Sequence, residues 1–133
     1  MNQKDYVLTS FGKYCAKCHF GLETFPPNFL YGEPQRVKAN LNRCAERIFF
    51  RLEMWRLNAD VRPEPPMPPA STLRRLNVDP EQWPHQDDLR ALRDYVSDVL
   101  RSQTGRVPKL EDLKNRGYDN LRECPPVTQV PQS

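Results

Sequence analysis

The segment Tyr14-Cys-Ala-Lys-Cys-His-Phe20, YCAKCHF in one-letter code, places two cysteines three positions apart and a histidine directly after the second. This C-x-x-C-H pattern is typical of c-type haem attachment. Two thiols on one short turn can both add to the vinyl groups along one haem edge, and the adjacent imidazole then reaches the iron. The pattern predicts that Cys15, Cys18 and His19 hold a haem c.

Two other interpretations of the motif remain open at this point. A C-x-x-C pair also occurs in dithiol redox proteins, but those place it in a βαβ context that this sequence does not predict. It also forms half of a four-cysteine zinc site, which would need a second C-x-x-C pair. The other two cysteines, Cys44 and Cys124, stand alone.

The composition predicts a single domain with a thin core. The chain has 133 residues, of which 38% are apolar, and its mean hydropathy is −0.80. Chains of this kind often fold around a cofactor, a metal or a disulfide. Charges of both signs are spread along the sequence with a net charge of +3, so nothing favours nucleic-acid binding. No apolar run approaches the ~18 residues of a membrane span.

Periodicity predicts helices and no strand. Helices are expected over residues 5–18, 35–58, 71–77, 87–102 and 110–115. The clearest is 35–58, where large apolar residues recur at spacings of three and four along one stripe. The stripe consists of Val37, Leu41, Cys44, Ile48, Leu52 and Trp55. The fold class is therefore predicted to be all-α, with long proline-rich loops between three main helices.

The best candidate for a second axial ligand is Met67, in the segment RPEPPMPP at residues 62–69. Five of these eight residues are prolines, so the backbone is stiff and a thioether held there loses little entropy on ligation. Three alternatives are weaker. Met54 is expected to pack inside the long helix, His85 to begin a helix at the surface, and a lysine is the remaining option.

These features together resemble the class I c-type cytochrome family, over roughly residues 6–101. Members have a helix leading into C-x-x-C-H with an aromatic residue four positions before the first cysteine, here Phe11. They bring a methionine from an extended loop, here Met67, and pack an aromatic residue of the last helix against the first, here Tyr95. Many members also have a small residue eight positions before the first cysteine, where this chain has Val7.

The resemblance implies a cytochrome c-like fold around one covalently bound haem c, with His19 and Met67 as axial ligands of the iron. The haem domain would span residues 1–103, and residues 104–133 would form a partly irregular C-terminal extension with a poorly ordered polar end. Four aromatic residues are expected to pack against the porphyrin: Phe25, Phe29, Tyr31 and Trp55.

Cys44 and Cys124 are expected to form a disulfide. Covalent haem is attached on the exported side of the membrane, where disulfides also form. The bridge would close a loop of about 80 residues and stabilise the fold by up to ~4.5 kcal/mol. The alternative is a buried, inert thiol at Cys44 and an unpaired Cys124.

The expected location is the periplasm or another exported compartment, although the first residues do not read as a signal peptide. Either an export signal was removed and Met1 added, or the chain is a domain of a longer exported protein. A mitochondrial carrier is a weaker alternative.

The expected function is electron transfer by a single haem, without enzymatic activity of its own. A redox donor and acceptor would dock near Lys13 and Lys17 at the exposed haem edge. One alternative is a haem subunit or domain that carries electrons within a larger dehydrogenase or oxidase. Further alternatives are a gas-sensing or peroxide-active haem domain and, last, a structural zinc module.

Overall fold

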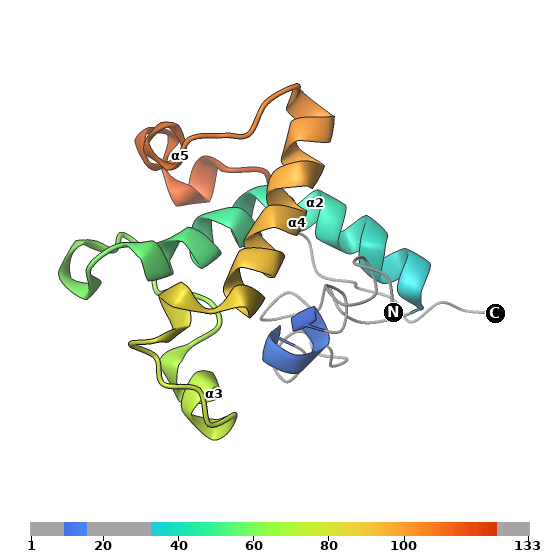
Figure 1. Ribbon diagram of the computed structural model, residues 1–133. Helices are drawn as coiled ribbons and strands as arrows, with labels where there is room; N and C mark the ends of the chain where they lie inside the picture. Colours follow the sequence, from blue (N-terminus) through green and yellow to red (C-terminus); the bar gives the residue numbers. More distant parts are fainter. Residues whose placement is uncertain (1–9, 16–32, 125–133) are drawn as a thin grey trace.

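The computed structural model describes residues 10–15 and 33–124, and every regular element in these ranges is helical (Figure 1). The expected all-α class is confirmed for this part of the chain, in which no strand occurs. Residues 10–15 are helical. The α-helices that follow are α2 (Pro34–Glu53), α3 (Ala70–Arg75), α4 (Asp87–Thr104) and α5 (Leu110–Arg116). Short 3₁₀ turns are η1 (Met54–Arg56), η2 (Ala59–Val61), η3 (Trp83–His85) and η4 (Tyr118–Asn120).

Helix α2 carries the predicted apolar stripe but ends earlier than expected. A proline occupies its first turn, where the missing N–H has no helical acceptor to lose. The α-helix ends at Glu53 rather than near Asn58, because the chain tightens into η1 and then becomes extended at Leu57. The tighter turn still buries Met54 and Trp55. The expected packing role of Met54 is therefore confirmed.

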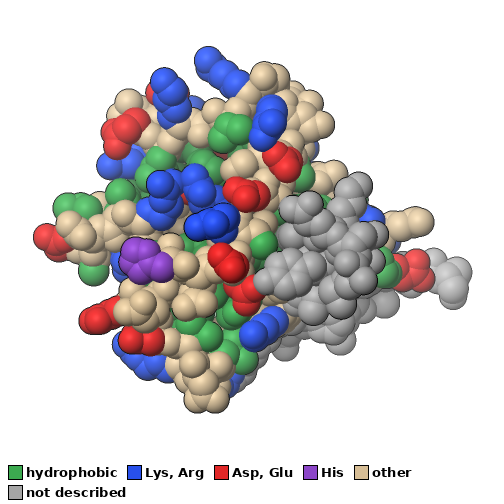
Figure 2. All heavy atoms as spheres, in the orientation of Figure 1, with side chains coloured by type: hydrophobic (Ala, Val, Ile, Leu, Met, Phe, Trp, Pro, Cys, Tyr) green, Lys and Arg blue, Asp and Glu red, His purple; other side chains and the backbone are tan. Residues whose placement is uncertain are grey.

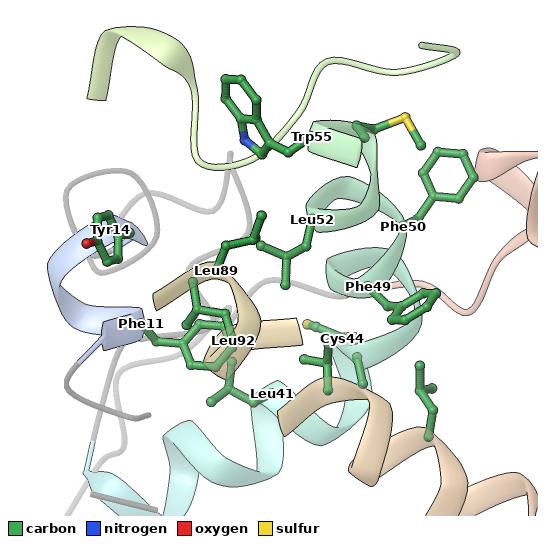
Figure 3. Packing of buried hydrophobic residues seen from close by; sticks show 14 of the residues in the cluster. Phe11, Tyr14, Leu41, Cys44, Phe49, Phe50, Leu52, Trp55, Leu89 and Leu92 are labelled. Carbon is green, nitrogen blue, oxygen red and sulfur yellow. The ribbon is translucent and has the colours of Figure 1, made fainter. Parts of the chain in front are cut away.

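Helices α2 and α4 cross at the centre of the molecule and form its main helix pair (Figure 1). Helix α4 has two aspartates in its first turn, which suits the positive end of the helix dipole, and it ends at Gly105 with φ 86°. The buried apolar side chains of both helices belong to one cluster (Figure 3). On α4 these are Leu89, Leu92, Val96 and Leu100.

A buried ion pair also joins the two helices. Glu53, only 4% exposed, closes α2. Its carboxylate accepts hydrogen bonds from Arg93 on α4 and, at 3.1 Å, from Arg56. The pairing with two guanidinium groups offsets the cost of taking the carboxylate out of water.

The helical segment at residues 10–15 packs against α4 as the family resemblance implied. The ring of Phe11 lies 5.8 Å from the ring of Tyr95 in an edge-to-face arrangement, a geometry that aromatic pairs prefer. The Tyr14 hydroxyl donates to Asp88 in the first turn of α4, and its ring lies 4.6 Å from that of Trp83. The expected aromatic contact between Phe11 in the helical segment 10–15 and Tyr95 of α4 is thus present.

Tyr95 gives this contact a pH dependence. Burial raises the pKa of Tyr95 above its ordinary value of 10.0, since the phenolate is disfavoured away from water. Above about pH 10 the unfolded chain therefore loses this proton before the folded chain does, and the free energy of unfolding is expected to fall as the pH rises. Urea unfolding at several values between about pH 9 and pH 11 should show a smaller fall for Tyr95→Phe than for the wild type. Equal slopes for the two proteins would contradict this expectation.

The C-terminal extension, residues 104–133, is described as far as Cys124 and shares the core of the preceding residues. Helix α5 matches the expected helix to within one residue at its C-terminal end. Leu113 and Leu121 are buried in the same apolar cluster as α2 and α4. Glu46 of α2 pairs with Arg116 at 3.1 Å and accepts the backbone N–H of Arg122 at 2.8 Å. The core is therefore continuous across residue 103. The polar end predicted to be poorly ordered, residues 125–133, lies outside the described residues.

Candidate functional site

Of the C-x-x-C-H motif, only its first residue, Cys15, lies within the described part of the chain. This residue is half-buried and lies four positions after Phe11, so both belong to the helix face that meets α4. Five of the other residues predicted for the motif and the porphyrin contacts lie outside the described residues, as does the proposed docking residue Lys17. They are Cys18, His19, Phe25, Phe29 and Tyr31. What the structure fixes is the anchor just before the motif, where Tyr14 is held by Asp88 and Trp83.

The Met67 segment, residues 62–69, contains no helix, as its prolines predicted. Its backbone makes three hydrogen bonds, two with Arg51 near the end of α2 and one with Trp55 in η1. The Met67 N–H donates to the Arg51 carbonyl at 3.2 Å. The Arg51 guanidinium donates to the Pro65 carbonyl at 3.0 Å. The indole N–H of Trp55 donates to the Pro68 carbonyl at 2.9 Å. Met67 itself is half-buried. Hydrogen bonds to the carbonyl groups of Pro65 and Pro68 hold the backbone on both sides of it.

Trp55 therefore lies beside the Met67 segment, and the structure brings these two predicted site residues together. Its side chain is buried, above Leu52 at the end of α2 in Figure 3. The guanidinium carbon of Arg62 lies 4.9 Å from the centroid of the Trp55 ring system. The same residues line an open cleft of about 470 Å³ between η1 and the turn that carries Pro80 and Pro84.

The weaker ligand candidates occupy the places expected for them. Met54 is fully buried in the apolar cluster. His85 is exposed in η3, two residues before α4 begins. Neither is bonded to the Met67 segment by any contact among the described residues, in contrast to Trp55 and Arg51.

Trp83 is a candidate site residue that sequence reasoning missed. It is fully buried, and its indole N–H has no hydrogen-bond acceptor among the described residues. A buried donor left without a partner costs about 1–3 kcal/mol, so an acceptor supplied by a bound group would remove that cost. Trp83 lies against Tyr14, one residue before Cys15. This orphaned donor fits a haem, because each haem has two carboxylates. The signal available in the sequence was a large aromatic residue between Pro80 and Pro84.

The structure brings Cys44 and Cys124 together. Their sulfur atoms are placed as a disulfide, with the Cα atoms 4.5 Å apart and the two residues 80 positions apart in the sequence. Cys44 is buried on α2, whereas Cys124 is half-buried at the end of the described chain. The arrangement suits a covalent tie between the extension and α2.

No family model, no curated protein and no solved structure matches this chain. None of the described helices is both long and apolar enough to cross a membrane. Within residues 10–15 and 33–124, no group of three or more His, Cys, Asp or Glu side chains is placed to hold a metal ion.

Proposed function

We propose that the protein is a monohaem c-type cytochrome that transfers electrons. Cys15 and Cys18 would hold the haem c covalently, and His19 and Met67 would be the axial ligands of its iron. The observation that carries the proposal is the C-x-x-C-H motif in a chain whose proline-flanked Met67 segment is hydrogen-bonded to Arg51 of α2 and to Trp55 of η1. The Phe11–Tyr95 contact supports the cytochrome c-like fold, in which the first and last helices meet.

When bound, the haem supplies a one-electron iron couple. The chain's own residues would position the haem and exclude water from it. Hydrogen bonds fix the backbone of the Met67 segment before ligation, so little conformational entropy would be lost when the thioether binds. Trp55 and, outside the described residues, Phe25, Phe29 and Tyr31 would cover the porphyrin. The unpartnered indole N–H of Trp83 would donate to a haem carboxylate.

A partner would approach near the thioether bonds. Lys13 is exposed there, with its amine 5.1 Å from the centroid of the Tyr14 ring, and Lys17 follows two positions after Cys15. On the face drawn in Figure 2, basic and acidic side chains are interspersed without a large area of one sign. A few local lysines favour a weak, salt-dependent encounter with an acidic redox partner. The proposed location is the periplasm or another exported compartment, where both haem attachment and the Cys44–Cys124 pair would be completed.

A second candidate function is a haem subunit or domain that carries electrons inside a larger oxidoreductase. The observation that favours it is the C-terminal extension, which has no counterpart in the resemblance yet is packed into the core. Size-exclusion chromatography of the native protein separates the two candidates, because a free carrier elutes alone. Carbon monoxide tests a gas-sensing domain, since it binds only where the axial thioether leaves the iron.

The decisive experiment is a pyridine haemochrome spectrum of the protein made in a host with cytochrome maturation machinery. One haem per chain should remain attached after denaturation, and ferric protein should show the weak red band of methionine–iron charge transfer. The Cys44→Ser/Cys124→Ser variant is the matched control and should keep its haem, because neither cysteine belongs to the motif. A colourless wild-type preparation would rule out the proposal.

A further inference from the structure

Arg51 connects the Met67 segment to a second part of the molecule. Its carbonyl accepts the Met67 N–H and its guanidinium donates to the Pro65 carbonyl. One residue of α2 therefore fixes the backbone of the segment both at Met67 and two residues before it. The other face of this guanidinium is covered by Tyr118 of the C-terminal extension, at 4.6 Å from guanidinium carbon to ring centroid.

Tyr118 and the Pro65 carbonyl together constrain where the Arg51 guanidinium points. Among the described residues, Arg51 has no carboxylate partner and its buried Nε has no acceptor. A cation over an aromatic ring is attracted to the ring face, and the attraction grows as water is excluded. The ring also packs against Phe50 at 5.2 Å between centroids. In Figure 3 the Phe50 side chain points from α2 toward the extension.

The extension is itself tied to α2 on both sides of Tyr118. Arg116 pairs with Glu46, and the backbone N–H of Arg122 donates to the same carboxylate. Arg47 donates to the carbonyl groups of Asp119 and Leu121, at 3.2 and 3.3 Å. The disulfide pair at Cys44 and Cys124 lies just beyond. The ring of Tyr118 is thus presented to Arg51 from a fixed position.

We propose that the C-terminal extension holds Met67 in place for the iron, with Tyr118 and Arg51 as positioning residues. The inference rests on the proposed function, in which Met67 is an axial ligand. If Tyr118 no longer covers the guanidinium, Arg51 releases the Pro65 carbonyl more often. The Met67 segment then departs more often from the end of α2, and a competing ligand takes the coordination position more readily.

The test is imidazole titration of the ferric holoprotein, in which the loss of the methionine–iron band reports imidazole binding. Losing the cation–ring contact in Tyr118→Leu should raise the apparent affinity for imidazole on the order of tenfold. Tyr118→Phe keeps the ring face and should behave as the wild type. Arg51→Lys keeps the charge but not the planar group, so it should resemble Tyr118→Leu. The double variant should add little, because both changes break the same contact.

A second measurement does not depend on ligation. Hydrogen exchange of the Met67 amide, which donates to the Arg51 carbonyl, should quicken in Tyr118→Leu and not in Tyr118→Phe. Phe49→Leu is the control for general destabilisation, since Phe49 is buried on α2 and should leave imidazole affinity unchanged. Wild-type values of both imidazole affinity and amide exchange in Tyr118→Leu would overturn the inference. Absence of the methionine–iron band in the wild type would instead overturn the proposed ligation, and the amide comparison would still decide whether Tyr118 holds the segment.

Discussion

Met67→Ala is expected to leave the haem attached and to abolish the methionine–iron charge-transfer band completely. The thioether bonds to Cys15 and Cys18 do not involve this residue, so the pyridine haemochrome should be unchanged. The sixth coordination position would open, and the reduced protein should bind carbon monoxide, which the wild type should not. The midpoint potential should fall by on the order of 0.1 V, within the ~0.8 V range that axial ligands span.

The matched control for this variant is Met54→Leu. Met54 is the other methionine within the described residues, fully buried in the core and not bonded to the Met67 segment. A Met-to-Leu exchange in a core usually costs less than about 1.5 kcal/mol, so the fold, the band and the lack of carbon monoxide binding should persist. If Met67→Ala kept the band, or if Met54→Leu lost it, Met67 would not be the residue whose thioether binds the iron.

Long-range apolar periodicity was the most dependable guide to the fold. The 3–4 spacing gives α2 and α4 one apolar face each, and these faces pack together in the apolar cluster. Both helices formed where the spacing predicted them. The end of α2 was less predictable, because the chain there tightens into η1, where Trp55 donates to the Pro68 carbonyl, a partner thirteen residues away. Local propensity carries no information about such a bond.

The residues of the candidate site also differ in whether local sequence or only the folded structure reveals them. Met67 could be selected from sequence because the prolines around it restrict the backbone locally. Arg51 could not, since one of fourteen arginines acquires its importance only through the Pro65 carbonyl and the Tyr118 ring. Trp83 was missed because an unsatisfied indole N–H is a property of its surroundings in the fold. The attachment itself, at Cys18 and His19, stays a prediction.

Removing the Cys44–Cys124 tie is expected to produce the largest loss of stability of any single change at the surface. The best variant is Cys124→Ser, because Cys124 is half-buried whereas Cys44 is 1% exposed and its replacement would also disturb the core. A cross-link between residues 80 positions apart removes chain entropy mainly from the unfolded state. Its loss should lower the free energy of unfolding by up to ~4.5 kcal/mol.

For a chain of this size that loss corresponds to a fall in Tm of up to about 15 °C. Denaturant unfolding of the holoprotein with and without dithiothreitol measures it, and the reductant spares the thioether bonds of the haem. Reduced wild type should match Cys124→Ser, and the variant should not respond to reductant. Two alkylatable thiols in the oxidised wild type, with no effect of reductant on its unfolding, would show that the pair is not bonded. In that case the non-covalent contacts would hold the extension to α2, among them those of Glu46, Arg47 and Tyr118 and the burial of Leu113 and Leu121.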